Sequence, residues 1–158
     1  MIGAIAHWEN AQWVVDSPYA QKKIIDFYKL TTKNFSAPHL ILIDVDNQSP
    51  ICGDEEITFE SYKSLETAIE AHKEANFVFL EVKHKIPKEF KPDELKDFVH
   101  PPEDVYYVVG SDFGSIDFSR LNPKQKNYYA AYIETGNAIP LWSHTALAIG
   151  LYDRSVKI

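Results

Sequence analysis

The chain has 158 residues, 45% of them hydrophobic and 13% aromatic, and its 16 basic and 23 acidic side chains give a formal net charge of −7. This length predicts one domain spanning residues 1–158, and the composition excludes a disordered chain and a coiled coil. The acidic balance counts against nonspecific nucleic-acid binding, because phosphate contacts are made by clustered Lys and Arg.

The first half of the chain alternates between strand-like and helix-like segments. Residues 2–6 and the branched segment 39–45 predict strands. Between them, Ser17 supplies an N-cap followed by proline, which predicts the start of a helix. A short strand over 57–61 precedes a second helix. The predicted inner face of the first helix is Ala20, Ile24, Phe27, Tyr28 and Thr31, and that of the second, capped by Ser64, is Leu65, Ala68, Ile69 and His72.

The second half continues this alternation. Residues 77–82 and 105–109 predict strands, joined by a connection over 83–102, and residues 131–133 predict a weaker strand. The final segment, 141–154, is apolar on nearly all sides, which is typical of a buried helix. The pattern predicts an α/β domain with a mainly parallel sheet flanked by helices. Ligands of such sheets bind outside the carboxyl ends of the strands, where Glu81, Gly110 and the residues after Ile133 lie.

Residues 110–115 form a glycine-containing segment after the most apolar predicted strand. Glycine allows a backbone to approach a ligand closely, so the segment is either a binding loop or a tight turn, and Asp112 shares that ambiguity. Glu81 interrupts an apolar run, and an ionised carboxylate there needs a partner. That partner is either a structural hydrogen-bond donor or a ligand.

No metal site is expected. Asp44, Asp46 and Glu55 resemble part of a calcium loop, but the glycine expected at the bend is Ser49. The six histidines lack metal-ligand spacing. Adjacent Ser143 and His144 point about 100° apart on a helix, so they cannot form a catalytic dyad, and they are interpreted as a cap and a partly buried ring.

Cysteine and hydropathy patterns point to the reducing cytosol. Cys52 is the only cysteine, so neither an intramolecular disulfide nor a cysteine-rich zinc site can form. The apolar stretch 1–6 lacks a basic leader, and no apolar run approaches the roughly 20 residues that a membrane helix needs. We therefore expect a cytoplasmic protein that does not span a membrane.

Charge is unevenly distributed. Residues 54–74 hold most of the excess acid, whereas lysines gather in 22–33 and in 83–91. If the two basic segments meet in space, they form one surface for RNA. Otherwise each is a solvated face.

Three ordered elements resemble the SpoU/TrmH-like branch of the SPOUT RNA methyltransferases. Small members of that branch carry HPE, an apolar strand and GPEDGSL, which is similar to residues 100–116 here (HPPEDVYYVVGSDFGSI). Their closing helix commonly ends in VLYDR, similar to residues 151–154, and their apolar strand ending in glutamate is similar to residues 79–81. The resemblance covers about half of the chain, from residue 77 to residue 154.

This resemblance implies a homodimeric α/β protein with a C-terminal trefoil knot that transfers a methyl group from S-adenosylmethionine to a ribose 2′-hydroxyl of tRNA or rRNA. Three knot loops then hold the cofactor, largely through backbone groups. Carried over to this chain, the cofactor-binding residues are Leu80, Glu81, Val109, Gly110, Gly114, Ile133, Thr135, Ile139 and Leu141.

The chain departs from the family pattern in its catalytic motifs. When the two are aligned on Ser17-Pro18, the family's catalytic arginine becomes Asp26, which cannot take over arginine's role. The family's Ser-Leu-Asn before the last helix is absent, and GPEDGSL has become GSDFGSI. Lys22, Lys23 and Ser143 remain as catalytic candidates.

Three functions fit these observations. The leading hypothesis is a methyltransferase that modifies RNA. The second is a diverged protein of the same fold that serves as an RNA-binding or dimeric interaction module, which the missing arginine and the net charge of −7 favour. The third is an unrelated α/β protein that binds another small ligand at the Gly110 loop.

Overall fold

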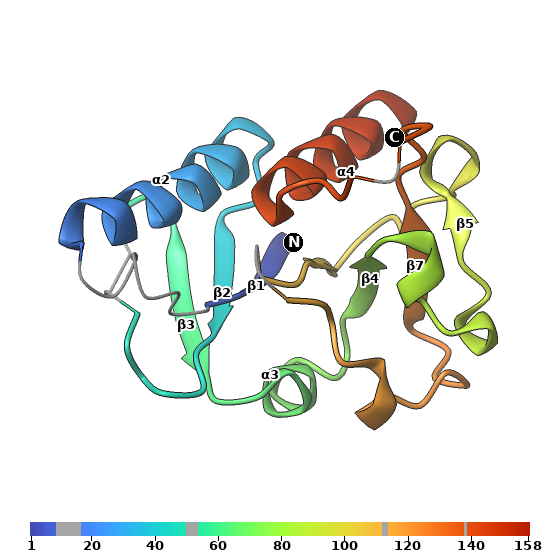
Figure 1. Cartoon of the computed structure of the whole chain (residues 1–158), viewed down its shortest axis with the longest axis horizontal. Helices are drawn as coiled ribbons and strands as arrows, with labels where there is room; N and C mark the ends of the chain where they lie inside the picture. Colours follow the sequence, from blue (N-terminus) through green and yellow to red (C-terminus); the bar gives the residue numbers. More distant parts are fainter. Residues whose placement is uncertain (9–16, 50–53, 112–113, 138) are drawn as a thin grey trace.

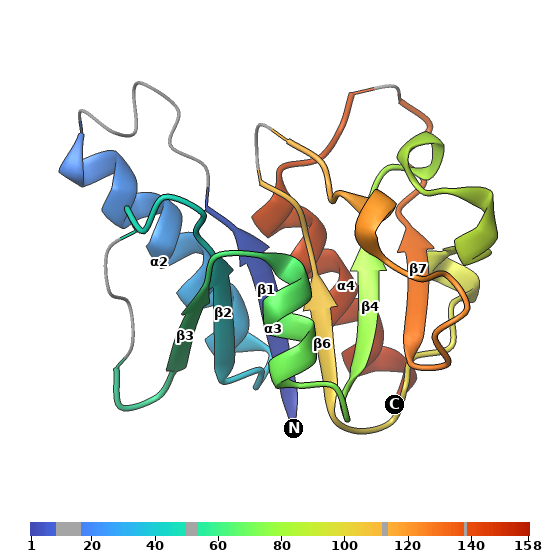
Figure 2. The same ribbon diagram turned by 90° about the horizontal axis from the view of Figure 1, so that it is seen from below.

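Seven strands form one sheet in the order β3-β2-β1-β6-β4-β7-β5 (Figure 1 and Figure 2). The computed structural model describes residues 1–8, 17–49, 54–111, 114–137 and 139–158, so Cys52 and Asp112 lie outside the described residues. Each neighbouring pair of strands in this sheet is parallel. The predicted α/β class with a mainly parallel sheet is confirmed.

The described elements follow the predicted order with shifted ends. The strands are β1 (Ile2–His7), β2 (His39–Ile43), β3 (Thr58–Tyr62), β4 (Asn76–Leu80), β5 (Asp93–Glu94), β6 (Val105–Val108) and β7 (Tyr128–Tyr132). The helices are α2 (Pro18–Asn34), α3 (Leu65–Ala71) and α4 (Ser143–Lys157), with short 3-10 helices η1 (Lys83–Lys85), η2 (Lys88–Phe90), η3 (Leu95–Asp97) and η4 (Phe118–Arg120).

Helices cover both faces of the sheet. α2 and α4 lie side by side on one face and α3 lies on the other (Figure 1). Alternate residues of β1 show this division, because Ala4 and Ala6 pack under α2 and α4 while Ile5 packs on the α3 side. Both faces are therefore apolar, which explains why the central strands appear in the sequence as continuous apolar runs.

The predicted helix caps are confirmed at both starts. Ser17 Oγ accepts a hydrogen bond from Ala20 N at 3.2 Å, and Ser64 Oγ accepts one from Thr67 N at 3.2 Å. Such side-chain acceptors satisfy backbone N–H groups that have no partner within the helix.

The predicted inner face of α2 is wrong in part. Ile25, Tyr28 and Thr32 are the buried residues, whereas Phe27 is 43% exposed. Phe27 instead stacks on the ring of His144 in α4, with ring centroids 4.6 Å apart. The face that α2 buries is therefore rotated from the predicted one, toward Ile25 and Thr32.

Helix α4 also differs from the prediction of burial on all sides. Leu147, Gly150 and Leu151 are buried against the sheet, but Tyr152 is 58% exposed. The N-cap is Trp142 and no side chain caps it, so the expectation of a Ser143 cap is wrong. His144 is a partly buried, stacked ring, as expected.

A buried polar network fixes the C-terminal half of α4 to the segment before β6. His100 contacts Tyr107 Oη through Nδ1 at 2.6 Å and Asp153 Oδ2 through Nε2 at 2.8 Å. Arg154 donates to the carbonyl oxygens of Pro101 and Pro102. The two family-like motifs, residues 100–102 and 151–154, therefore contact each other, and their histidine and arginine are structural.

Two histidines, the half-buried His7 and the buried His100, make stability depend on pH. Burial lowers the pKa of His7, and it lowers the pKa of His100 although the Asp153 carboxylate acts in the opposite direction. Below about pH 6.5 the unfolded chain therefore binds protons that the folded chain does not. The free energy of unfolding then decreases as the pH is lowered. We expect urea unfolding to give a lower free energy at about pH 5.5 than at about pH 7.5. A constant value would contradict the assignment of neutral, buried imidazoles.

Among the described residues, no helix is both long enough and apolar enough to cross a membrane.

Candidate functional site

A cavity of about 550 Å³ opens where β4, β6 and β7 end and α4 begins. The residues around it come from segments that are far apart in sequence. All nine residues predicted to contact a cofactor line it, namely Leu80, Glu81, Val109, Gly110, Gly114, Ile133, Thr135, Ile139 and Leu141. The other described residues that line it are Val82, Lys85, Ser111, Ser115, Asn137, Pro140, Trp142, Ser143 and Ala146.

Sheet register places these segments beside one another. Phe79 of β4 lies opposite Val108 of β6, and Leu80 lies opposite Ala131 of β7, so the three strands end at the same level. His7 holds the end of β6, because its Nδ1 lies 2.8 Å from the carbonyl oxygen of Val109. Burial lowers the pKa of His7, which leaves the ring neutral with a proton on Nδ1 to donate.

Glu81 connects β4 to the loop that follows β6. Its Oε2 accepts a hydrogen bond from Ile116 N at 3.0 Å, and its Oε1 accepts one from Val82 N at 2.8 Å. The carboxylate thus has structural donors and still lines the cavity. The sequence predicted either a structural hydrogen-bond donor or a ligand as the partner of Glu81, and structural donors are observed.

Gly110 lies where the backbone folds tightly against itself. A Cβ at this position would lie 3.0 Å from Gly114 O and 3.3 Å from Ile116 N. These neighbours are backbone atoms, which cannot rotate away as a side chain does. The absence of a side chain at Gly110 therefore sets the shape of the loop on this side of the cavity.

The segment between β7 and α4 forms the outer wall of the cavity. Gly136 adopts a left-handed conformation with φ of 74°, and its N–H donates to Glu134 Oε1 at 2.9 Å. Beyond this turn, Ile139 is 80% exposed and Trp142 is 53% exposed. These apolar side chains at the cavity edge suit a ligand with a flat or aliphatic part.

The catalytic candidates separate into two places. Ser143, the first residue of α4, is buried and lines the cavity. Lys22 and Lys23 are exposed on α2 and do not line it. Lys85 of η1 does line it and was missed, because in the sequence it is one of several lysines in the segment 83–91 with nothing to distinguish it.

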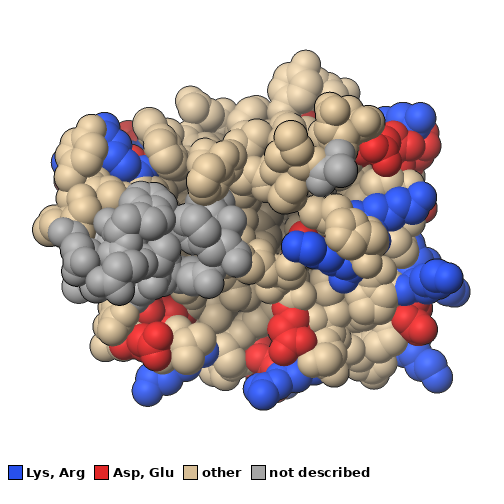
Figure 3. Space-filling model, viewed as in Figure 1, with Lys and Arg blue, Asp and Glu red and all other residues tan. Residues whose placement is uncertain are grey.

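The two basic segments do not meet. α2 covers the half of the sheet that contains β2 and β3, whereas η1 and η2 lie beside β7 and β5 at the other end (Figure 1). Lys29 and Lys33 form ion pairs with Asp54 at 2.8 and 3.1 Å, and Lys33 also pairs with Glu56. Lys85, in the segment 83–91, is the one lysine among the described residues that line the cavity. Figure 3 shows basic atoms gathered at that end of the molecule.

Asp44, one residue of the calcium-like triplet, has structural hydrogen-bond donors. Asp44 is buried and its carboxylate accepts hydrogen bonds from Gln48 N at 3.0 Å and Ser49 N at 2.8 Å. It therefore stabilises the turn after β2.

No sequence profile of a protein family and no curated protein sequence matches the chain. Solved structures do. The SpoU methyltransferase AviRb from Streptomyces viridochromogenes, in complex with AdoMet, superposes with a TM-score of 0.65 at 12% identity over 96% of this chain and 58% of that one. A TrmH-family putative RNA methyltransferase from Porphyromonas gingivalis gives 0.62 at 12% identity, over 97% and 59%. The TrmH/SpoU tRNA modifying enzyme of A. aeolicus gives 0.68 at 11% identity, over 99% and 74%.

These similarities extend over nearly the whole of this chain and establish that it has a SpoU/TrmH-type fold. The chain spans less than two thirds of the length of the first two of these proteins.

Proposed function

We propose that the chain binds S-adenosylmethionine in the cavity at the ends of β4, β6 and β7, and methylates an RNA. The observation that carries this proposal is the assembly of all nine expected cofactor-binding residues around one cavity, in a fold that it shares with RNA methyltransferases. One of those proteins was solved with AdoMet, and another is described as a tRNA modifying enzyme.

The cavity fits the cofactor in size and chemistry. Its volume of about 550 Å³ lies within the range of roughly 300–1,000 Å³ that small-molecule sites occupy. Gly110 and Gly114 line the cavity without side chains, which leaves room for a ligand against their backbone. Leu80, Ile133 and Leu141 supply apolar contacts. Leu80, Val109 and Gly110 would hold the cofactor on the sheet side, and Ile139 and Leu141 on the outer side.

The proposed target is a ribose 2′-hydroxyl of tRNA or rRNA. S-adenosylmethionine supplies an activated methyl group, so the protein's task is to orient the hydroxyl and to accept its proton. Ser143 is the catalytic candidate that lines the cavity. Lys85 also lines the cavity, and its ammonium group would bind a phosphate of the RNA. For Lys22 or Lys23 to take part in the reaction, the bound RNA would have to extend from the cavity to α2.

Transfer of labelled methyl groups tests the activity. The chain is incubated with methyl-labelled S-adenosylmethionine and with total tRNA or rRNA, and the RNA is digested to nucleosides. We expect label in a 2′-O-methylated nucleoside and loss of transfer in Lys85→Glu. Label on a base instead would overturn the ribose assignment.

A second function is favoured by Asp26. It lies on α2 at the position that corresponds to the family's catalytic arginine, and its carboxylate repels phosphate. This observation supports a diverged protein that binds RNA or pairs with a second copy without catalysis. Binding of S-adenosylmethionine with no transfer to any RNA would select this alternative.

We also propose that the chain is a cytoplasmic homodimer and that its C-terminal region forms a trefoil knot, as the resemblance implies. Support for the dimer comes from exposed apolar side chains on α2 and α4, including Leu30 at 59%, Tyr152 at 58% and Val156 at 60%. Along the upper edge in Figure 3, where α2 and α4 lie, the middle is uncharged and charged atoms lie at both ends. Light scattering should give twice the mass of 18.1 kDa, and Tyr152→Glu should shift it toward one copy.

Replacing Glu81 with Ala should loosen the cofactor site. Ile116 N then loses its acceptor, so the loop after β6 is no longer fixed to β4. We expect the affinity for S-adenosylmethionine to fall by about tenfold, equivalent to about 1.4 kcal/mol, which is the order of one hydrogen bond to a charged group. Glu89→Ala, on the exposed surface of η2, is the matched control and should bind as the wild type does. Equal affinity in both variants would place the ligand away from this loop.

A further inference from the structure

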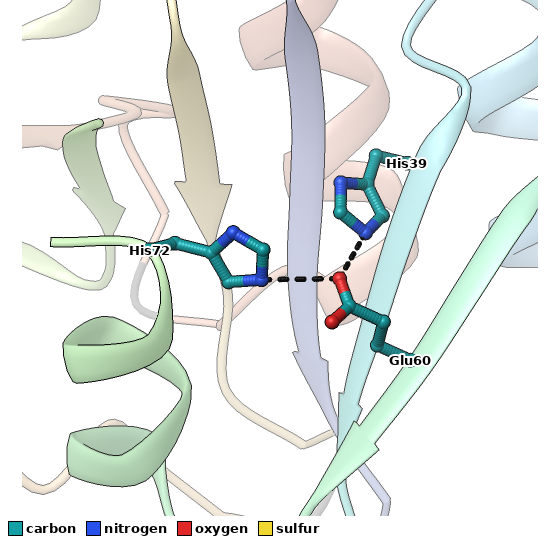
Figure 4. Close-up of side chains that lie close together, drawn as sticks. All are labelled: His39, Glu60 and His72. Atoms are coloured by element: carbon teal, nitrogen blue, oxygen red, sulfur yellow. Dashed lines mark ion pairs between the residues drawn. The ribbon is translucent and has the colours of Figure 1, made fainter. Parts of the chain in front are cut away.

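A second cluster of chemically active side chains lies on the α3 side of the sheet. His39 begins β2, Glu60 lies in β3, and His72 caps the end of α3, and all three point toward one another (Figure 4). One ligand atom from each lies within 4.8 Å of the others. His72 Nε2 is 3.0 Å from Glu60 Oε2, and His39 Nε2 contacts the same oxygen.

Both Nε2 atoms face the Glu60 carboxylate without forming a hydrogen bond of normal geometry to it. They are buried, and neither has a hydrogen-bond partner of normal geometry within the described part of the chain. A buried polar atom without a partner is costly, and native proteins rarely keep one without a reason. A cation placed between the two nitrogens and the carboxylate would satisfy all three groups.

The opposite side of each ring is held in the orientation that a metal ligand needs. Tyr106 Oη lies 2.7 Å from His39 Nδ1 and 3.2 Å from His72 Nδ1. The Tyr106 oxygen can accept a hydrogen bond from an Nδ1–H of each ring. That tautomer leaves the lone pair of Nε2 free. Metal-binding histidines commonly donate their second N–H in this way.

The carboxylate is oriented as well. Tyr62 Oη donates to Glu60 Oε1 at 2.7 Å, which leaves Oε2 for the histidines. The Glu60 carboxylate is thereby turned so that one oxygen faces both imidazole rings.

A glycine allows this arrangement. Gly3 of β1 lies between Tyr106 and His39 in the register of the sheet. A Cβ at Gly3 would lie 2.6 Å from Tyr106 Cε1, so only a residue without a side chain lets the tyrosine ring cross β1 to reach His39.

We propose that His39 Nε2, His72 Nε2 and Glu60 Oε2 bind a divalent transition-metal ion, with Zn²⁺ as the probe. Two imidazoles and one carboxylate are an established zinc ligand set that leaves a fourth position for water. Zinc bonds of about 2.0–2.2 Å require the carboxylate to draw back slightly from the rings, and the Glu60 side chain, 32% exposed, has room to do so.

This proposal is independent of the methyltransferase site and reverses the expectation of no metal. That expectation rested on spacing along the sequence, whereas these ligands are brought together by strand register and by the end of α3. A bound ion would fasten α3 to β2 and β3 and would stabilise the folded chain by mass action.

Zinc titration of the full, untagged chain tests the proposal. After treatment with a chelator and dialysis, calorimetry should show one Zn²⁺ per chain, and the melting temperature should rise with added Zn²⁺. His72→Ala and Glu60→Gln should each weaken binding at least about tenfold, a change that corresponds to losing one ligand. His84→Ala removes an exposed histidine of η1 and should bind as the wild type does.

A fourth variant separates a ligand set from a general loss of packing. Tyr106→Phe keeps the ring but removes the hydroxyl that orients both imidazoles, so affinity should fall about 10- to 100-fold while the stoichiometry stays at one. Circular dichroism checks that each variant is folded. Absence of zinc binding in the folded wild type, or equal affinity in Glu60→Gln and Tyr106→Phe variants and the wild type, would overturn the metal site.

Discussion

Replacing Gly110 with Val should lower the affinity for S-adenosylmethionine at least about 100-fold, or about 2.7 kcal/mol, while the chain stays folded. The Cβ alone approaches Gly114 O at 3.0 Å and Ile116 N at 3.3 Å, and the valine methyl groups extend further. The loop must therefore move. Because Gly110 and Gly114 both line the cavity, this movement changes the surface that the cofactor would contact.

Gly110→Ala is the graded control for this prediction. It adds only the Cβ, so its loss of affinity should be smaller than that of the valine variant. Equilibrium dialysis with labelled S-adenosylmethionine measures both, and circular dichroism checks the fold. Wild-type affinity in the valine variant would place the cofactor elsewhere.

Arg154→Ala should lower the free energy of unfolding by about 3 kcal/mol and the melting temperature by about 6–12 °C. Arg154 is 6% exposed, and its guanidinium donates to the carbonyl oxygens of Pro101 and Pro102, the latter at 2.6 Å. Removal of the side chain leaves these carbonyls without that donor and opens a cavity under α4.

The other arginine of the chain, Arg120, supplies the matched control. Its side chain is 72% exposed and its contact with Glu66 is long, at 3.7 Å, so Arg120→Ala should change stability by less than about 0.5 kcal/mol. Thermal unfolding of both variants measures the difference. Equal melting temperatures would show that the network at Pro101 and Pro102 contributes no stability.

Local signals allowed most of the fold to be predicted from the sequence. Ser17 and Ser64 cap their helices because a cap depends only on the next three residues. The strands around Leu40, Phe77 and Tyr106 were recognisable because they are buried on both faces. The two-residue strand β5 was missed because Asp93 and Glu94 are charged, and only pairing with β7 makes them a strand.

Features that depend on contacts between distant elements were less predictable. Phe27 of α2 stacks on His144, which lies 117 residues further along the chain, and no local pattern predicts this contact. The residues around the cavity were predicted because a family resemblance supplied their order. Lys85 and the cluster of His39, Glu60 and His72 have no such pattern, so only the structure brings them to notice.

Equilibrium dialysis of the wild-type chain against labelled S-adenosylmethionine tests the central claim most directly. We expect saturable binding of one molecule per chain, competed by unlabelled S-adenosylmethionine and lost in Gly110→Val. Absence of saturable binding at millimolar concentrations of S-adenosylmethionine would contradict the assignment of the cavity as a cofactor site.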